Sequence, residues 1–204
     1  MKTLLSAALA SLTLTTANAQ NRITVHLYNL SGLFRDTLDR ATHEASRIFA
    51  QVEVAIDWQL GDSEAEEAHM TDPSGPAAWR DAYARPWLVV RVGRGLAFHV
   101  PNGALGISLP HAQSGVSATI FQERVESLCQ SAGQDLAVML GHEIAHEIGH
   151  VTLASDTHAP NGIMRARWGK AELGDAASGH LGFTPQQGAE IRAYGARVLA
   201  QAGR

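Results

Sequence analysis

Apolar and polar side chains alternate along two segments near the N-terminus, residues 23–30 and 52–59, and this pattern predicts two β-strands. Between them, residues 37–51 place apolar side chains at helical spacing, which predicts an amphipathic helix with one face toward a core. The apolar positions of that helix are Leu38, Ala41, Ala45, Ile48 and Phe49. The chain therefore opens with a strand, a helix and a second strand.

Three further segments have the character of strands. Residues 87–92 are apolar enough for a central strand, whereas residues 105–109 contain a glycine and precede Pro110, as suits an edge strand. Residues 118–121 predict a fifth short strand, which runs into a helical turn at residues 123–128. The first two thirds of the chain thus predict five strands with one helix among them.

The last third of the chain is helical at both ends. Residues 135–152 predict the longest helix, and residues 156–170 are irregular and loop-like. The run Thr184-Pro185-Gln186-Gln187 is a capping box with proline at the first helical position, so it predicts the start of a C-terminal helix. Because no internal repeat or linker interrupts this order, we expect a single domain of the α+β class.

Composition sets the broad class of protein. A chain of 204 residues is long enough for one sizeable core, and 45% hydrophobic with 18% charged residues is typical of a folded globular protein. The formal net charge of −4 gives no electrostatic basis for binding nucleic acid or an anionic membrane. We therefore expect neither as a partner.

The first nineteen residues have the pattern of a secretory signal peptide. Lys2 supplies a positive start, residues 4–14 are a modest apolar stretch, and Ala17-Asn18-Ala19 is an A-x-A cleavage site. The apolar stretch is too short to span a bilayer. We expect a signal peptide at residues 1–19, cleavage after Ala19, a mature domain at residues 20–204 that does not insert into the membrane, and a secreted or periplasmic location.

Cys129 is the only cysteine, so an intramolecular disulfide is impossible even in an oxidising compartment. Its apolar neighbours predict a buried thiol without a catalytic role.

The candidate chemistry lies in the predicted long helix, where residues 140–150 read L-G-H-E-I-A-H-E-I-G-H. This run contains two overlapping H-E-x-x-H motifs: His142, Glu143 and His146 form the first, and His146, Glu147 and His150 form the second. Residues four apart stack on one helix face, so either pair of histidines could bind one metal ion with a glutamate beside it as general base.

Helix geometry excludes a site that uses all three histidines. His142 and His150 are eight residues apart, which is roughly 12 Å along the axis at ~1.5 Å per residue. Nitrogens bound to one zinc ion at ~2.0–2.1 Å must lie much closer together than that. One of the two outer histidines is therefore a spectator.

Catalytic zinc takes three protein ligands, so a third must come from elsewhere in the chain. Two candidates follow the helix: Asp156 lies six residues after His150, and His158 lies eight residues after it. A loop that turns back after the helix could bring either side chain to the metal.

H-E-I-G-H followed by a further ligand and by Asn161-Gly162-Ile163-Met164 resembles the metzincin branch of zinc metallopeptidases, and the sequence also resembles a group of exported bacterial proteins with H-E-I-G-H, a later histidine and G-I-M-R-A-x-W. The resemblance implies a twisted five-stranded mixed sheet with a backing helix, an active-site helix and a C-terminal helix. It also implies one catalytic Zn²⁺, Glu147 as general base, Met164 in a Met-turn beneath the metal, and a peptide substrate extended along the edge strand at residues 105–109.

Two departures from the metzincin pattern affect the third ligand. Leu153 stands at the position of the family's glycine, and Asp156 stands at the position of its third ligand. We favour His158, because imidazole is the commoner ligand and its spacing to G-I-M matches the bacterial group, with Asp156 as the runner-up. The predicted site is thus His146, His150 and His158 on zinc, with Glu147 as the base and His142 as the spectator.

Two other functions remain open at this stage. In a gluzincin-type peptidase, a later helix would supply a glutamate ligand such as Glu172 or Glu190. In an exported zinc-binding or interaction protein, the metal would be bound without hydrolysis. A partial copy of the motif also occurs at His43 and Glu44, but Arg47 stands where its second histidine belongs, and we interpret that stretch as a solvated helix face.

Overall fold

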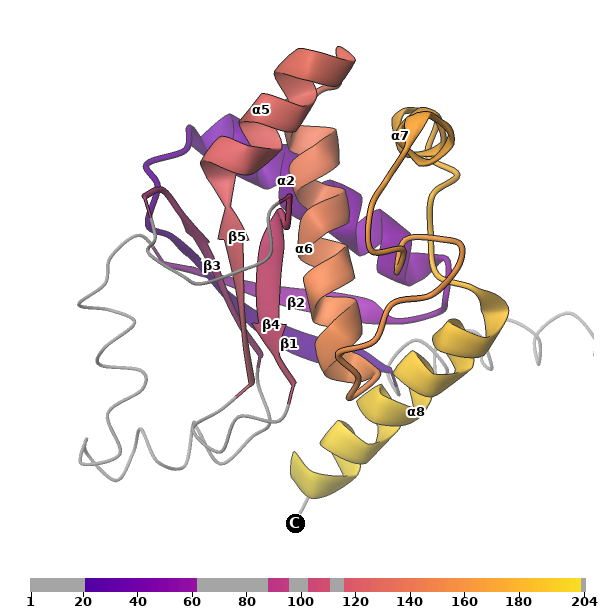
Figure 1. Cartoon of the computed structure of the whole chain (residues 1–204). Coiled ribbons are helices and arrows are strands. Elements are labelled where there is room, and N and C mark those ends of the chain that lie inside the picture. Colours follow the sequence, from indigo (N-terminus) through magenta and orange to yellow (C-terminus); the bar gives the residue numbers. More distant parts are fainter. Residues whose placement is uncertain (1–20, 62–87, 96–102, 111–115, 203–204) are drawn as a thin grey trace, which may run out of the picture.

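The structure is a computed structural model, and it describes residues 21–61, 88–95, 103–110 and 116–202. Its elements, in chain order, are β1 (Arg22–Asn29), α2 (Arg35–Ala50), β2 (Ala55–Gly61), β3 (Leu88–Gly93), β4 (Gly106–Leu109), β5 (Val116–Phe121), α5 (Gln122–Ala132), α6 (Leu136–Thr152), α7 (Lys170–Ala177) and α8 (Pro185–Ala202) (Figure 1). The expected signal peptide at residues 1–19 lies outside the described residues.

The five strands form one mixed sheet with the order β2-β1-β3-β5-β4. Four strands are parallel, and β4 runs antiparallel to β5, with Ile107 opposite Thr119. β4 is an edge strand, as its glycine and the following proline predict. The α+β class and the five-stranded mixed sheet are confirmed.

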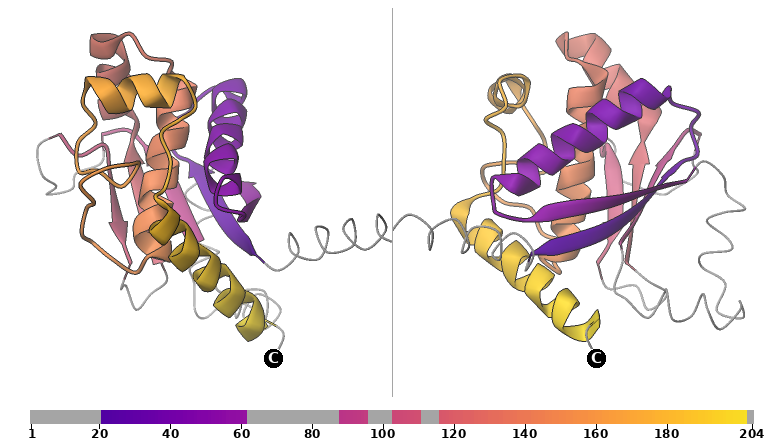
Figure 2. Two further views of the ribbon diagram at one scale, coloured as in Figure 1. Left: turned by 90° about the vertical axis from the view of Figure 1, so that its right-hand side faces the viewer. Right: turned by 180° about the vertical axis from the view of Figure 1, so that it is seen from behind.

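The core lies between the sheet and two helices, α2 and α6, which pack side by side (Figures 1 and 2). Alternate residues of β1, namely Ile23, Val25 and Leu27, are fully buried, which is the period-two pattern of a strand covered on that face. The apolar stripe predicted for the first helix is also buried at all five positions. α8 crosses the ends of β1 and α6 and closes the domain (Figure 2).

Two details differ from the sequence-based expectation. β2 begins at Ala55 instead of residue 52, because the chain first turns after α2: Val52 and Val54 donate to the carbonyl of Phe49, and Glu53 takes a positive φ of 60°. Helix α7 was not predicted. It is only eight residues long and buries only Leu173 and Ala176, so it offers almost no helical periodicity to recognise.

Among the helices that the structure describes, none is both long enough and apolar enough to cross a membrane.

Candidate metal centre

α6 begins with a side-chain cap. Asp135 is the N-cap residue, and its carboxylate accepts a hydrogen bond of 3.0 Å from the backbone N–H of Val138. The same carboxylate pairs with Arg40 on α2 at 2.8 Å, which fixes the start of α6 against the neighbouring helix. These contacts lower the pKa of Asp135, with the hydrogen bond from Arg40 as the largest cause. The helix that carries the histidines is therefore anchored at its first turn.

α6 ends without the glycine that the metzincin pattern places at position 153. Leu153 stays right-handed as the C-cap residue, and Ala154 takes the left-handed conformation with φ of 48°. The N–H of Ser155 then donates to the carbonyl of His150 at 3.0 Å, which closes the helix end. A non-glycine residue in this conformation costs about 1 kcal/mol, and the turn still reverses the chain toward the helix.

His146 and His150 point their Nε2 atoms toward each other at a distance of 3.1 Å. His146 Nδ1 lies 2.8 Å from the carbonyl of Ile163, and His150 Nδ1 lies 2.7 Å from the carbonyl of Ser155. A carbonyl oxygen only accepts, so both Nδ1 atoms carry the proton and both Nε2 atoms present a lone pair. The loop after α6 thus sets the tautomer of both rings.

Charge makes this arrangement favourable to a cation. Burial lowers the pKa of His146 to about 3, and burial likewise lowers the pKa of His150, so both rings are neutral near pH 7. Two neutral rings with facing lone pairs at 3.1 Å form no hydrogen bond with each other. A metal ion between them would satisfy both nitrogens.

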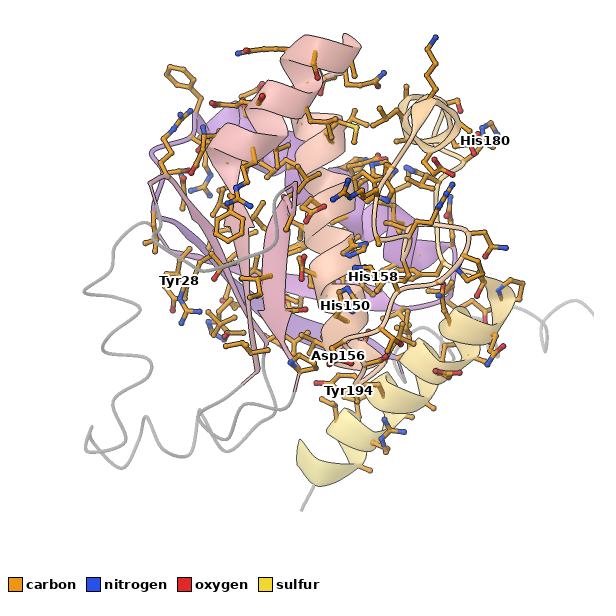
Figure 3. The ribbon with its side chains drawn as sticks, viewed as in Figure 1. Tyr28, His150, Asp156, His158, His180 and Tyr194 are labelled. Carbon is orange, nitrogen blue, oxygen red and sulfur yellow. The ribbon has the colours of Figure 1, made fainter. Side chains whose placement is uncertain are left out.

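His158 joins these two residues from the loop that follows α6. The candidate ligand atoms of His146, His150 and His158 all lie within 4.8 Å of one another. Figure 3 shows His158 beside His150 in front of α6, and their ring centroids are 4.8 Å apart. Asp156 lines the same cavity but is not a member of this three-residue group. His142, the other outer histidine of the row, also lies outside it.

The donor set suits zinc. Three neutral imidazoles are the ligands of a catalytic zinc site that keeps its fourth position open. The three side chains line a cavity of about 680 Å³ bordered by β4 and by residues 165–168, so the open side faces space for a ligand. The residues present therefore fit a catalytic zinc ion better than a closed structural one.

Glu147 lies beside the histidines and is 4% exposed. Its carboxylate is hydrogen-bonded to Ser108 of β4 and to Glu143, whereas its Oε2 atom has no partner among the described residues. Burial raises the pKa of Glu147 to about 7, which suits a group that takes and returns a proton at neutral pH. Gly106 allows this approach, since a Cβ there would lie 2.9 Å from Oε1 of both Glu143 and Glu147.

Met164 lies under the C-terminal half of α6. It is buried, and a Cβ added to Gly149 would lie only 2.6 Å from its sulfur. The turn that delivers Met164 needs Gly162, which has a φ of 72° and packs against the carbonyl of Gly182. Ile163, in the same turn, provides the carbonyl that binds both His146 and the indole N–H of Trp168.

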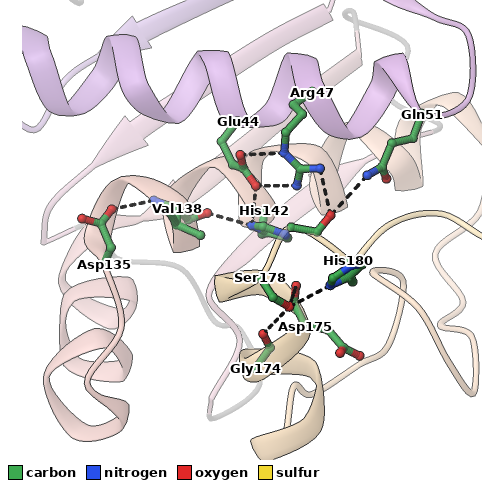
Figure 4. A network of polar contacts seen from close by, with 11 residues as sticks. Glu44, Arg47, Gln51, Asp135, Val138, His142, Gly174, Asp175, Ser178 and His180 are labelled. Carbon is green, nitrogen blue, oxygen red and sulfur yellow. Dashed lines mark hydrogen bonds and ion pairs between the residues drawn. The ribbon is translucent and has the colours of Figure 1, made fainter.

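His142 is fully buried in a polar network that joins α2, α6 and the end of α7 (Figure 4). Its Nδ1 donates to Val138 of its own helix at 2.9 Å and lies 3.6 Å from the carboxylate of Glu44. Arg47 pairs with that carboxylate and donates to the carbonyl of Gly179 at 2.9 Å. The solvated face expected at His43 and Glu44 holds for His43, which is exposed, whereas the Glu44 and Arg47 side chains are partly buried, at 15% and 32% exposed.

Known proteins were compared with this chain. No family model matches it, and no curated protein sequence does. Its fold does match solved structures. A zinc-dependent peptidase from Methanocorpusculum labreanum aligns over 82% of this chain and 99% of its own, with a TM-score of 0.57 and 16% sequence identity. An archaemetzincin from Methanopyrus kandleri aligns over 85% of this chain and 95% of its own, with a TM-score of 0.46 and 15% identity. The first of these likenesses shows a shared fold.

The glutamates that a gluzincin-type site would need are engaged elsewhere. Glu172 pairs with Arg165 and accepts a hydrogen bond of 2.8 Å from the N–H of Gly169, which caps α7. Glu190 accepts from Gln186 on the exposed side of α8. Neither belongs to the three-histidine group.

Two features of the site were not predicted from sequence. Glu143 contacts Glu147, and the spacing of four between them was the available signal. The Glu44–Arg47 pair on α2 gave no comparable signal, because its partner His142 is about 100 residues away. Cys129 is buried, as expected, and burial raises the pKa of its thiol to about 11.

Proposed function

We propose that this protein is a zinc metallopeptidase. The observation that carries the proposal is the meeting of three imidazoles with Glu147, whose free Oε2 lies buried at the same cavity. Two histidines have their tautomers set by backbone carbonyls, as metal ligands require. The solved structure from Methanocorpusculum labreanum, which shares the fold, is described as a zinc-dependent peptidase, and this supports the proposal.

Each residue then has a defined part. His146, His150 and His158 hold the metal, with Met164 as the apolar floor under the helix. A zinc ion held by these residues would polarise a peptide carbonyl and would lower the pKa of bound water toward ~7. Glu147 accepts the proton of the attacking water and delivers it to the departing amine, and its pKa of about 7 suits both transfers.

The substrate in this proposal is a peptide that lies extended beside β4. Residues 103–108 form one wall of the cavity, and β4 pairs with β5 on one side only among the described strands. An extended peptide could therefore add to this edge through main-chain hydrogen bonds. We further propose that the chain acts outside the cytoplasm, on the basis of the signal-like sequence at residues 1–19.

The decisive test is Glu147→Gln. Gln keeps the shape of the side chain but cannot take up a proton, so we expect zinc stoichiometry to stay at one and kcat to fall by about 10²–10⁴-fold. Zinc content and cleavage of a broad peptide library would be measured together. Glu126→Gln on α5, which does not line the cavity, is the matched control and should behave as wild type.

The outcomes separate the alternatives. Undiminished cleavage by Glu147→Gln overturns the assignment of the base. One tightly bound zinc with no cleavage of any library member, in the wild-type protein, favours a zinc-binding or interaction protein. Full zinc retention after loss of His158 favours Asp156 or another group as the third ligand.

A further inference from the structure

Glu143 is a second buried carboxyl at the site, and the proposed mechanism does not use it. It lies one turn before Glu147 on α6, so the two side chains stack on one helix face. Both are 4% exposed, and both line the cavity. Burying a carboxyl group costs free energy unless the group is hydrogen-bonded, so the partners of Glu143 indicate its role.

The principal partner of Glu143 is Glu147 itself, since the two carboxyl groups are hydrogen-bonded to each other. A Cβ on Gly106 would lie 2.9 Å from Oε1 of each, so the backbone of β4 holds both groups closely together. Ser108, two residues along the same strand, contributes a second hydrogen bond to Glu147.

A hydrogen bond between two carboxyl groups needs one proton. Two carboxylates in contact away from water cannot both be charged. Burial raises the pKa of Glu143 well above its ordinary value, and the neighbouring Glu147 raises it further. Glu143 is therefore the donor, and Glu147 accepts from it and from the Ser108 hydroxyl. Glu147 Oε2 is buried and has no partner among the described residues, so neither of these bonds uses that oxygen.

We infer that Glu143 is a positioning residue for Glu147: through its hydrogen bond and the closure by Gly106, it fixes the rotamer of the Glu147 carboxylate at the wall of the cavity. The inference rests on the proposed function for its kinetic consequence, but the geometry can be tested without it. For this role Glu143 only has to act as a neutral hydrogen-bond donor and never has to release its proton. A neutral donor of the same shape should therefore be able to replace Glu143.

Two other roles for Glu143 fit less well. It is not a member of the three-histidine group, so it is no metal ligand there. As the base of the first H-E-x-x-H motif it would need His142 on the metal. His142 is not a member of that group, although its Nε2 atom has no partner among the described residues.

The test compares three variants of the full chain. Glu143→Gln keeps a neutral donor, Glu143→Leu keeps the volume without a donor, and Gly106→Ala separates the two carboxyls without removing either. We expect Glu143→Gln to stay within about 3-fold of wild-type kcat. Glu143→Leu and Gly106→Ala should lose about 10–100-fold in kcat, with KM and zinc stoichiometry unchanged, as is usual for loss of an outer hydrogen-bond partner. Glu126→Leu on α5 is the control for loss of a carboxyl elsewhere.

A second measurement does not depend on activity. Crystal structures of the metal-free proteins should show one Glu147 rotamer in wild type and Glu143→Gln, and a turned or split Glu147 in Glu143→Leu. Wild-type kcat in Glu143→Leu, or in Gly106→Ala with the carboxyls apart, overturns the inference. So does a Glu143→Gln variant as impaired as Glu143→Leu, since that would mean that Glu143 must release its proton.

The crystal structures of the metal-free variants also test this inference independently of the proposed function. If the wild-type protein cleaves nothing, the proposed function fails, and the Glu147 rotamer in metal-free Glu143→Leu still decides the positioning role. An unmoved Glu147 in that variant rejects it. If Glu143→Leu does not fold, Gly106→Ala gives the same decision through the same two readouts.

Discussion

The two halves of α6 carry the same kind of residues and use them differently. His142 in the N-terminal half and His150 in the C-terminal half are both buried, and each interacts electrostatically with an acidic side chain, Glu44 and Asp156 respectively. The Nδ1–H of His142 donates a hydrogen bond to the carbonyl of Val138 in its own helix, whereas the Nδ1–H of His150 donates to the carbonyl of Ser155 in the following loop. The two histidines therefore differ in the segments of the chain that surround them and not in their own chemistry.

That difference has a physical lesson. A histidine bonded to its own helix is fixed by local structure, and at His142 the surroundings are α2 and the end of α7 (Figure 4). His146 and His150 are fixed by carbonyls that reach them only after the chain has turned at Ala154 and Gly162. The metal site thus depends on a folded loop, whereas the His142 network stabilises the packing of helices.

The largest expected contrast concerns zinc. His150→Ala removes a ligand, so we expect zinc affinity to fall by more than about 100-fold, beyond the ~10–100-fold that loss of an outer partner causes. His142→Gln should keep zinc affinity within a few-fold of wild type and lower only the free energy of unfolding. Zinc titration with a competing chelator checks both. Equal loss of zinc in the two variants would contradict the separation.

The next contrast concerns two glycines, one in each half of α6. A Cβ at Gly141 would lie 2.6 Å from the backbone carbonyl of Ala41, whereas at Gly149 it would lie 2.6 Å from the sulfur of Met164. Overpacking costs about 1–3 kcal/mol, and alanine recovers about 1 kcal/mol of helix propensity. A backbone carbonyl cannot swing aside but a thioether can, so Gly141→Ala should destabilise by about 2 kcal/mol. Gly149→Ala should destabilise by less, although its Cβ would also lie 2.9 Å from the ring of Phe183.

Urea unfolding of the metal-free variants measures this second contrast. Gly149→Ala should instead displace Met164 and lower zinc affinity, which Gly141→Ala should not. The reverse pattern would show that the floor under the metal is stiffer than the contact between α2 and α6.

The smallest expected effect is a pH dependence. The pKa of His142 is lowered in the folded protein, chiefly by burial. As the pH falls, His142 is therefore protonated in the unfolded chain at a higher pH than in the folded protein. The associated stability is fully present above the unfolded pKa of about 6.5 and is lost below it. In metal-free protein, His142→Gln should therefore flatten the loss of unfolding free energy below about pH 6.5, by at most about 1.4 kcal/mol per pH unit. Identical slopes for wild type and His142→Gln would show that His142 is protonated in the folded state.

The fold and the principal site residues were accessible from sequence for a common reason. Helical spacing of four set the histidine row, and axial distance allowed only one of its two outer histidines at a metal. Alternation of apolar and polar residues predicted the first two strands, apolar composition predicted the third, and Pro110 marked the edge strand. These signals are local, so they need no knowledge of which elements meet.

The rest depends on contacts between distant segments. The contact of Glu143 with Glu147 is enclosed by Gly106, about 40 residues earlier, and nothing in the helix sequence reports that approach. The helix end at Ala154 uses a non-glycine residue in the left-handed conformation, which propensity argues against. The sequence left Asp156 and His158 as alternatives, and the structure groups His158 with His146 and His150.

The carbonyl of Ile163 accepts hydrogen bonds from two rings at once, His146 Nδ1 at 2.8 Å and Trp168 Nε1 at 3.1 Å. The Trp168 indole and the His146 ring are also nearly perpendicular, with centroids 5.9 Å apart. Any change in the electron density of the His146 imidazole therefore reaches the indole through one shared oxygen. The other described tryptophan, Trp58, bonds to Ser46 and has no such link. Trp168 is thus a built-in fluorophore whose emission should report the occupancy of the site, without a label or a substrate.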